Sequence, residues 1–184
     1  MLKIIHAESE QHFKIAREMM LEYAAWLEFK LCFQGFDEEL QTLPGKYAPS
    51  AGRLLLALWN DNPAGMGALR PLEHDGENGA CEMKRLYVRP EFRGHSIGRA
   101  LAEKLIQEAR EIGYTVMRLD TVPGKMDAAI ALYRELGFEQ IGPYYSTPVA
   151  GTLFMQLALR PAPIIRNSNT ASDKLGSGAS GKDA

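Results

Sequence analysis

One short stretch of the chain, residues 86–101, combines basic side chains, glycines and the start of a predicted helix. Backbone N–H groups at a helix start point toward one spot, and the helix dipole adds positive potential there, so that such a junction binds phosphate or pyrophosphate. Arginines would add charge-assisted hydrogen bonds, and glycines let the backbone approach closely because they lack a Cβ. The residues predicted to surround the anion are Arg93, Gly94, His95, Ser96, Ile97, Gly98 and Arg99.

The same residues fit a second pattern. Gly94-His95-Ser96-Ile97-Gly98 matches the Gly-x-Ser-x-Gly turn that carries the nucleophilic serine of α/β-hydrolases. In that fold the histidine of the catalytic triad follows the serine in the chain. All four histidines of this chain precede Ser96. We therefore expect Ser96 to offer its backbone N–H group to the anion and not to act as a nucleophile.

Two segments of the chain resemble the GNAT superfamily of N-acetyltransferases. The family signature is Arg or Gln, two variable residues, Gly, one variable residue, and then Gly or Ala. Arg93 and Gly98 occupy the ends of this signature, and Ser96 stands at its inner glycine. The second segment, Ala128 to Phe138, is similar to a late helix of the family with its Leu-Tyr…Gly-Phe ending. The resemblance extends over roughly Met1 to Leu159.

This resemblance implies a co-substrate and two catalytic residues. Acetyl-CoA would bind at the basic loop, with its pantetheine arm along backbone groups of Leu86, Tyr87 and Val88. Counting back from the loop, Glu82 matches the glutamate that acts as general base in histone-type members. Tyr133 matches the tyrosine whose phenol protonates the departing thiolate.

Each of these roles has an alternative. Glu82 is equally suited to cross-strand ion pairs with basic neighbours, since many family members deprotonate the amine through water instead. Asp120 is a weaker candidate for the base and better suits a structural role. Tyr133 also suits a half-buried position on an amphipathic helix. Met126 stands where many family members have an asparagine that contacts the cofactor arm, and its thioether cannot replace the hydrogen bonds of an amide.

No motif identifies the acceptor of the acetyl group. Aromatic residues that could line its pocket or belong to the core are Trp26, Phe33, Tyr144 and Tyr145. The acidic run Asp37-Glu38-Glu39 could attract a cationic amine or form the solvated start of a helix. Our interpretation is an acetyl-CoA-dependent N-acetyltransferase that acts on a primary amine of a small molecule or peptide by direct attack in a ternary complex. The alternative is a catalytically weak acyl-CoA-binding or regulatory module on the same fold.

Composition limits the class of protein and its partners. With 184 residues, 46% of them hydrophobic, the chain suits one domain with a proper core. The net charge of −2 provides no global basic field, so we expect neither nucleic-acid nor membrane binding. Cys32 and Cys81 lack the spacing of a metal site, and no metal is expected. The N-terminus lacks the long apolar stretch of a signal peptide, which favours the cytoplasm. The oligomeric state, a homodimer included, is left open.

Apolar periodicity predicts the elements that would position these groups. Strands are expected at 2–5, 53–59, 64–70, 80–88, 115–119, 138–141 and 152–159, and helices at 9–27, 36–43, 96–111 and through Tyr133 to Gly137. This order indicates an α/β (α+β) fold, a GNAT-like mixed, mostly antiparallel sheet flanked by helices on both faces. Residues 1–160 are expected to form this single GNAT domain. The polar residues 161–184 are expected to be a disordered tail.

Overall fold

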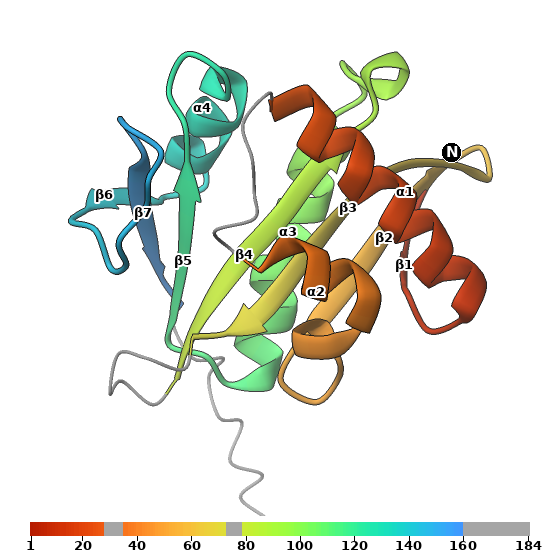
Figure 1. The fold of residues 1–184 in the computed structure, drawn as a ribbon, viewed down its shortest axis with the longest axis horizontal. Helices are drawn as coiled ribbons and strands as arrows, with labels where there is room; N and C mark the ends of the chain where they lie inside the picture. The colour runs from red at the N-terminus through yellow and green to blue at the C-terminus, as the bar shows by residue number, and fades with distance from the viewer. Residues whose placement is uncertain (28–34, 73–78, 160–184) are drawn as a thin grey trace, which may run out of the picture.

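The computed structural model describes residues 1–27, 35–72 and 79–159. Within them, seven strands form one sheet with the order β1-β2-β3-β4-β5-β7-β6 (Figure 1). The strands are β1 (Leu2–His6), β2 (Arg53–Trp59), β3 (Asn62–Pro71), β4 (Ala80–Val88), β5 (Val116–Thr121), β6 (Glu139–Ile141) and β7 (Leu153–Ala158). The helices are α1 (Glu10–Leu27), α2 (Phe36–Thr42), α3 (Ile97–Ile112) and α4 (Asp127–Glu135), with 3-10 turns η2 (Gly45–Tyr47) and η3 (Pro90–Phe92).

Strand pairing confirms the predicted mixed, mostly antiparallel sheet. Neighbouring strands run antiparallel except β4 and β5, which are parallel. The chain between β4 and β5 forms α3, because a parallel pair needs a crossover connection. The strand β7 returns between β5 and β6, so the last strand of the described chain is not at the edge of the sheet.

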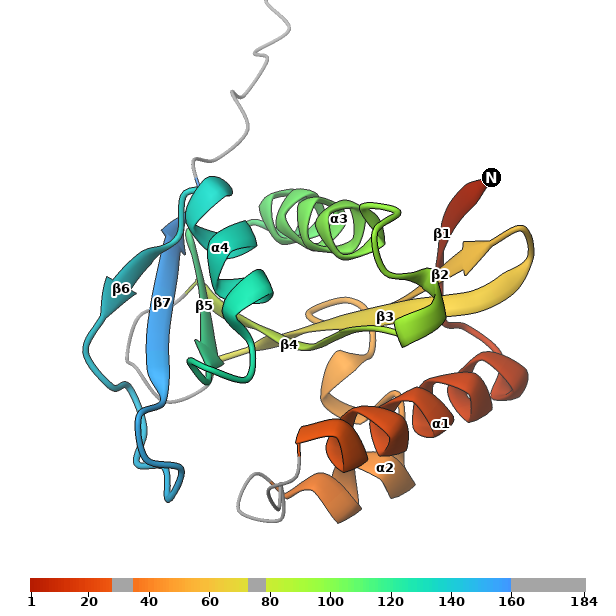
Figure 2. The same ribbon diagram turned by 90° about the horizontal axis from the view of Figure 1, so that it is seen from above.

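The helices cover both faces of the sheet, as the sequence predicts. Figure 2 shows α3 and α4 on one face and α1 with α2 on the other. Helix α3 buries Ile97, Leu101 and Leu105, one apolar stripe at helical spacing, against the strands. Helix α1 buries its own stripe in a second core on the opposite face. In β4, Cys81 and Met83 point to the α3 side, so Glu82 and Lys84 point to the α1 and α2 side.

The sheet opens between β4 and β5, and we call this opening the fork. Only 80–82 of β4 pair with 116–118 of β5, although both strands continue beyond these residues. Figure 1 shows the two strands diverging from that end. A β-bulge bends β4 here, because Arg85 and Leu86 together oppose Gly67 of β3. Arg85 adopts a left-handed φ of 56° at the bulge. A Cβ on Gly67 would lie 2.9 Å from Leu105 Cδ1 and 3.3 Å from Leu86 Cδ1, so a larger residue there would make these leucine side chains shift.

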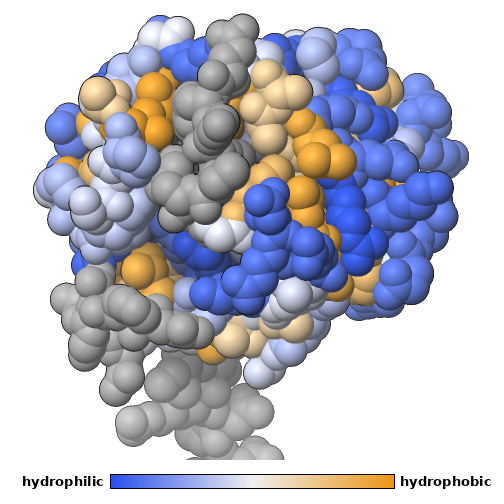
Figure 3. All heavy atoms as spheres, in the orientation of Figure 1, coloured by the Kyte–Doolittle hydropathy of each residue, from blue (hydrophilic) through white to orange (hydrophobic). Residues whose placement is uncertain are grey.

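The surface in the orientation of Figure 1 is uneven in polarity. Apolar side chains appear on both sides of the central grey segment, whereas the right edge of the molecule is mostly hydrophilic (Figure 3). Among the described residues, we find no helix with both the length and the apolar character that a membrane crossing requires.

Candidate active site at the fork

A groove of about 430 Å³ lies where β4 and β5 have separated. The end of α1, the end of β4, the loop before α3 and the start of α4 form its walls. Eight of the ten residues predicted to bind the cofactor line it, namely Leu86, Tyr87, Val88, Arg93, Gly94, Ser96, Ile97 and Gly98. Met126, which stands at the family's asparagine position, also lines the groove. The residues that the sequence did not single out for this role are Tyr23, Trp26, Phe92, Lys125, Ala128, Ala129 and Leu132.

The loop before α3 presents unpaired backbone donors. Ser96 caps the helix with a left-handed φ of 57°, and its side chain makes no capping hydrogen bond. In the described part of the chain, the N–H groups of Ser96, Ile97 and Gly98 have no acceptor. The hydrogen bonds of the helix begin with the N–H of Ala100, which donates to the carbonyl oxygen of Ser96. Donors of this kind at a 16-residue helix fit a phosphate group.

Two cations approach the indole ring of Trp26 at the groove. The guanidinium carbon of Arg93 lies 5.4 Å from the ring centroid, and Lys125 Nζ lies 5.8 Å from it. Arg93 Nε also donates to the carbonyl oxygen of Val88 at 3.2 Å. Trp26, considered above for the acceptor pocket, therefore lies at the groove.

The structure does not bring His95 and Arg99 to the groove. The guanidinium of Arg99 pairs with Glu135 of α4 and lies 3.6 Å from Glu103 of its own helix. The imidazole of His95 packs against the indole of Trp59, with ring centroids 4.6 Å apart. Both side chains thus point away from the groove, toward Glu135 and Trp59. Their positions in the sequence do not predict these directions.

A small cavity joins the groove to the inner end of the fork, and we call it the junction. Its volume of about 30 Å³ is lined by Tyr23, Met83, Lys84, Arg85, Leu86, Leu119, Asp120 and Tyr133. Lys84 Nζ donates to Asp120 Oδ1 at 2.7 Å, and this ion pair crosses the fork from β4 to β5. Tyr23 and Leu86 belong to both the junction and the groove.

Burial controls the protonation of the groups at the junction. Burial raises the pKa of Tyr133, and it raises the pKa of Tyr23 to about 12, so both phenols stay protonated near neutral pH. Burial would also raise the pKa of Asp120, but the charge of Lys84 lowers it below its usual value. The junction therefore holds protonated phenols beside an ionised carboxylate.

Beyond the junction, Glu82 lies in a cavity of about 420 Å³. We call this the acceptor cavity, and its lining is Lys46, Arg70, Pro71, Leu72, Glu82, Tyr144 and Tyr145. Glu82 is 2% exposed, and it stands directly opposite Arg70 in the register of β3 and β4. Arg70 Nε donates to Glu82 Oε2 at 2.8 Å, and the Tyr144 hydroxyl donates to Oε1 at 2.7 Å. The cross-strand ion pair that the sequence left as an alternative for Glu82 is thus present.

The acidic run in the first turn of α2 is only partly solvated. Glu39 accepts two hydrogen bonds from Arg85, at 2.8 and 2.7 Å, and one from the Tyr47 hydroxyl at 2.7 Å. Burial would raise the pKa of Glu39, but the hydrogen bonds and charge of Arg85 lower it. Asp37 and Glu38 are exposed. The sequence analysis did not predict the contact of Glu39 with Arg85, because the two residues are far apart in the chain.

No group of three or more His, Cys, Asp or Glu side chains among the described residues is placed to hold a metal ion. Cys81 is buried, which raises the pKa of its thiol. Cys32, Phe33, His74 and the predicted tail at 161–184 lie outside the described residues.

Comparison with known proteins assigns this arrangement to a family. The acetyltransferase (GNAT) family profile matches residues 16–138. An uncharacterized N-acetyltransferase of Schizosaccharomyces pombe is 38% identical over 142 residues, which cover 77% of this chain and 85% of that protein. A GNAT acetyltransferase from Staphylococcus aureus Mu50 has a similar fold, with a TM-score of 0.71 and 22% identity over 87% of this chain and 100% of that one.

A further structural neighbour, yncA from Salmonella typhimurium, was solved with its cofactor acetyl-CoA. Its TM-score is 0.65, with 22% identity over 87% of this chain and 95% of that one. The family profile spans more than half of the chain, and the yeast relative agrees with it. The chain therefore belongs to the GNAT acetyltransferase family and is an N-acetyltransferase.

Proposed function

We propose that acetyl-CoA binds in the groove and that its acetyl group passes to a primary amine in the acceptor cavity, by direct attack in a ternary complex. The observation that carries this proposal is the set of unpaired N–H groups at Ser96, Ile97 and Gly98, which open onto a groove leading to the fork. Support for the donor comes from yncA, a protein of similar fold whose structure contains acetyl-CoA.

The residues of the groove suit the parts of this donor. The N–H groups before α3 and the guanidinium of Arg93 would bind phosphates. Beyond Glu82, the edge of β4 that faces β5 pairs with no strand of the described residues. Its backbone donors and acceptors are free to bind an extended ligand, as at any exposed sheet edge. Leu86, Tyr87 and Val88 lie on this edge and line the groove.

The transfer needs two proton movements. The amine nitrogen attacks the thioester carbonyl carbon, so a C–N bond forms and the C–S bond breaks. The nitrogen loses a proton to a base, and the sulfur leaves as a thiolate that takes a proton from an acid. We assign the acid to Tyr133, because it lines the junction and burial keeps its phenol protonated.

We assign the base to Glu82, which lies in the acceptor cavity near the fork. Both of its oxygens already accept hydrogen bonds, and Lys84 Nζ lies 3.7 Å from Oε1. The amine proton can therefore reach Glu82 in two ways. The Tyr144 hydroxyl moves away from Oε1, or it transfers its own proton to Oε1 and accepts the proton of the amine. Asp120, which is ionised at the junction, is the second candidate.

A thiol-release assay tests this function. Purified protein is mixed with acetyl-CoA and with a panel of amines, amino acids and peptides, and free coenzyme A is measured. We expect release that depends on both the amine and the protein, with N-acetylated product identified by mass. Binding of acetyl-CoA without turnover on any amine would replace this proposal with the acyl-CoA-binding module.

A further inference from the structure

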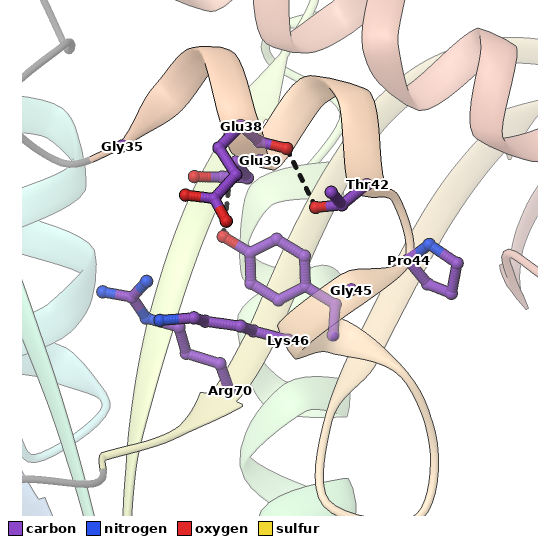
Figure 4. A pocket seen from close by; sticks show the side chains of 9 residues that line it. Gly35, Glu38, Glu39, Thr42, Pro44, Gly45, Lys46 and Arg70 are labelled. Atoms are coloured by element: carbon purple, nitrogen blue, oxygen red, sulfur yellow. Dashed lines mark hydrogen bonds between the residues drawn. The ribbon is translucent and has the colours of Figure 1, made fainter.

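Two cavities adjoin on the acceptor side of the fork, because Lys46 and Arg70 line both of them. One is the acceptor cavity, and the other, of about 410 Å³, lies along α2 and η2. Figure 4 shows the side chains of Lys46 and Arg70 extending in the same direction beneath the carboxylates of Glu38 and Glu39. Two cationic groups therefore meet at the boundary between the cavities.

Charged side chains of both signs lie around the acceptor cavity and its boundary. The cations are Lys46 and Arg70 in its lining, Lys84 beside Glu82, and Arg118, whose guanidinium carbon lies 5.6 Å from the Tyr144 ring centroid. The carboxylates are Glu82 and Asp120, and each already has a basic partner, Arg70 and Lys84. At the boundary, Glu39 is paired with Arg85, and Glu38 is exposed. Lys46 has no carboxylate partner among the described residues.

Lys46 and Arg70 have donors to spare. Lys46 is exposed, and it makes no hydrogen bond or ion pair with any residue that the structure describes. Both contacts of Arg70 with Glu82, from Nε and Nη2, fall on the single oxygen Oε2. In the described residues, Nη1 of Arg70 has no polar partner. A guanidinium beside an ammonium is the donor set that a planar carboxylate fits.

We infer that the acceptor is a primary amine that also carries a carboxylate, which Lys46 and Arg70 hold at the boundary of the two cavities. This inference rests on the proposed function, in which the acceptor cavity binds the amine. Arg70 stands opposite Glu82, whereas Lys46 lies on the exposed turn η2, so the carboxylate faces outward and the amine faces the fork.

The test compares matched acceptors with a matched set of variants. Each acceptor is an amino acid paired with its own amide, which keeps the amine and removes the negative charge. Rates are measured by thiol release and are compared per concentration of neutral amine, because amidation lowers the amine pKa. Lys46→Glu and Lys46→Gln are compared with Lys14→Gln, which changes an exposed lysine on α1 away from both cavities.

We expect the wild type to prefer the carboxylate over the amide by about tenfold or more in kcat/KM, since a hydrogen bond to a charged group is worth roughly 1.5–3 kcal/mol. Lys46→Glu should raise the KM for the carboxylate-bearing acceptor by about tenfold. It should leave the KM values for the amide and for acetyl-CoA unchanged. Lys46→Gln should have a smaller effect in the same direction, and Lys14→Gln none.

The outcomes separate this inference from the proposed function. Acetylation of carboxylates and amides with equal kcat/KM, or a carboxylate preference that Lys46→Glu does not reduce, would overturn the inference and leave the acetyltransferase activity in place. Acetylation of no amine in the panel would overturn the proposed function and the inference with it.

Discussion

Ser96 occupies a backbone conformation that glycine adopts without strain. Its φ of 57° is left-handed, and such a conformation costs a non-glycine residue roughly 1–2 kcal/mol. The family signature has a glycine at this position, so the serine keeps the geometry of the signature at some cost in stability. The departure that the sequence shows at Ser96 therefore leaves the N–H donors of the loop in place.

At Tyr133, we expect replacement by phenylalanine to separate chemistry from packing. The ring packs beside Phe138, with centroids 5.6 Å apart, and Phe keeps this contact while removing the hydroxyl. The Kd of acetyl-CoA should barely change, and kcat should fall within the roughly 10²–10⁴-fold range of general acid catalysis. Steady-state thiol release and a binding titration measure both quantities. Equal kcat values in wild type and variant would show that Tyr133 is a packing residue.

At Glu82, we expect replacement by glutamine to lower turnover most at low pH. There the amine is largely an ammonium ion, so the need for a base is greatest, and a general base contributes roughly 10²–10⁴-fold. The pH–rate profile of Glu82→Gln against wild type measures this, with acetyl-CoA binding as the control. Because Glu82 also neutralises Arg70, a melting curve must show that the variant is folded. A profile parallel to that of the wild type would assign the proton to another group.

At the scale of elements, the start of α3 and the diverging end of β4 together create the groove. Gly98 lies in the first turn of the helix without a left-handed φ. A Cβ there would have Val88 Cγ2 as its nearest neighbour, at an ordinary distance of 3.7 Å. Glycine is thus not required for the fold at this position, and under the proposed function the space beside it would hold the ligand.

We therefore expect Gly98→Ala and Gly98→Val to fold and to weaken acetyl-CoA binding in that order. The alanine variant adds one methyl group at the groove, and the valine variant adds two further methyl groups that would crowd the phosphates. Calorimetric titration with acetyl-CoA gives the affinities, and circular dichroism checks the helix content. Normal affinity in Gly98→Val would place the phosphates away from this turn.

Helix α3 is also fixed to β1 and β2 through a buried carboxylate, that of Glu108. It accepts hydrogen bonds from three side chains, His6, Arg53 and Lys104, at 2.9, 2.7 and 2.9 Å. Burial would raise the pKa of Glu108, but these hydrogen bonds lower it to about 2. A carboxyl group with a lowered folded-state pKa stabilises the fold above its unfolded value, and this contribution is lost as the pH falls through the folded value.

The prediction is that Glu108 contributes to stability at pH 5 and above and loses this contribution between about pH 4.5 and pH 2. Urea unfolding of wild type and Glu108→Gln at several pH values measures it. The difference in unfolding free energy between the two proteins should shrink over this interval. Glu103→Gln, on an exposed position of the same helix, should show no comparable change. A difference that stays constant with pH would contradict the assignment.

The sequence predicts the elements better than the fork between them. The strands can be predicted from the sequence because β4 and its neighbours alternate or concentrate apolar residues. Helix α3 can be predicted because its apolar residues repeat at helical spacing. The fork depends on a bulge at Arg85, whose left-handed φ no propensity favours and whose partner, Glu39, lies on α2. Likewise, the ion pair of Arg99 with Glu135 depends on where the fold places α4. Contacts between distant segments carry this information, and local patterns do not contain it.

At the scale of the whole molecule, the sheet consists of two parts joined at the fork. Strands β1 to β4 form one part, and β5, β7 and β6 form the other. Three residue pairs, those of 80–82 with 116–118, connect them directly, together with the ion pair of Lys84 and Asp120. A ligand in the groove would contact β4 on one side and α4 on the other, and would therefore connect the two parts.

We expect acetyl-CoA to raise the melting temperature of the protein for this reason. A ligand that binds the folded state alone contributes about 2.7 kcal/mol at a hundred times its Kd, or roughly 5–10 °C for a domain of this size. Thermal melts with acetyl-CoA measure the shift, with dephospho-coenzyme A and inorganic phosphate as controls. An unchanged melting temperature at millimolar acetyl-CoA would contradict binding in the groove.

The fork also sets a rule for inhibitors. If donor and acceptor bind as proposed, a compound that occupies the groove and the acceptor cavity together would carry its linker across the fork, where the ion pair of Lys84 and Asp120 joins β4 to β5. A slender linker would leave this ion pair in place, whereas a branched or aromatic linker would have to separate Lys84 from Asp120 first.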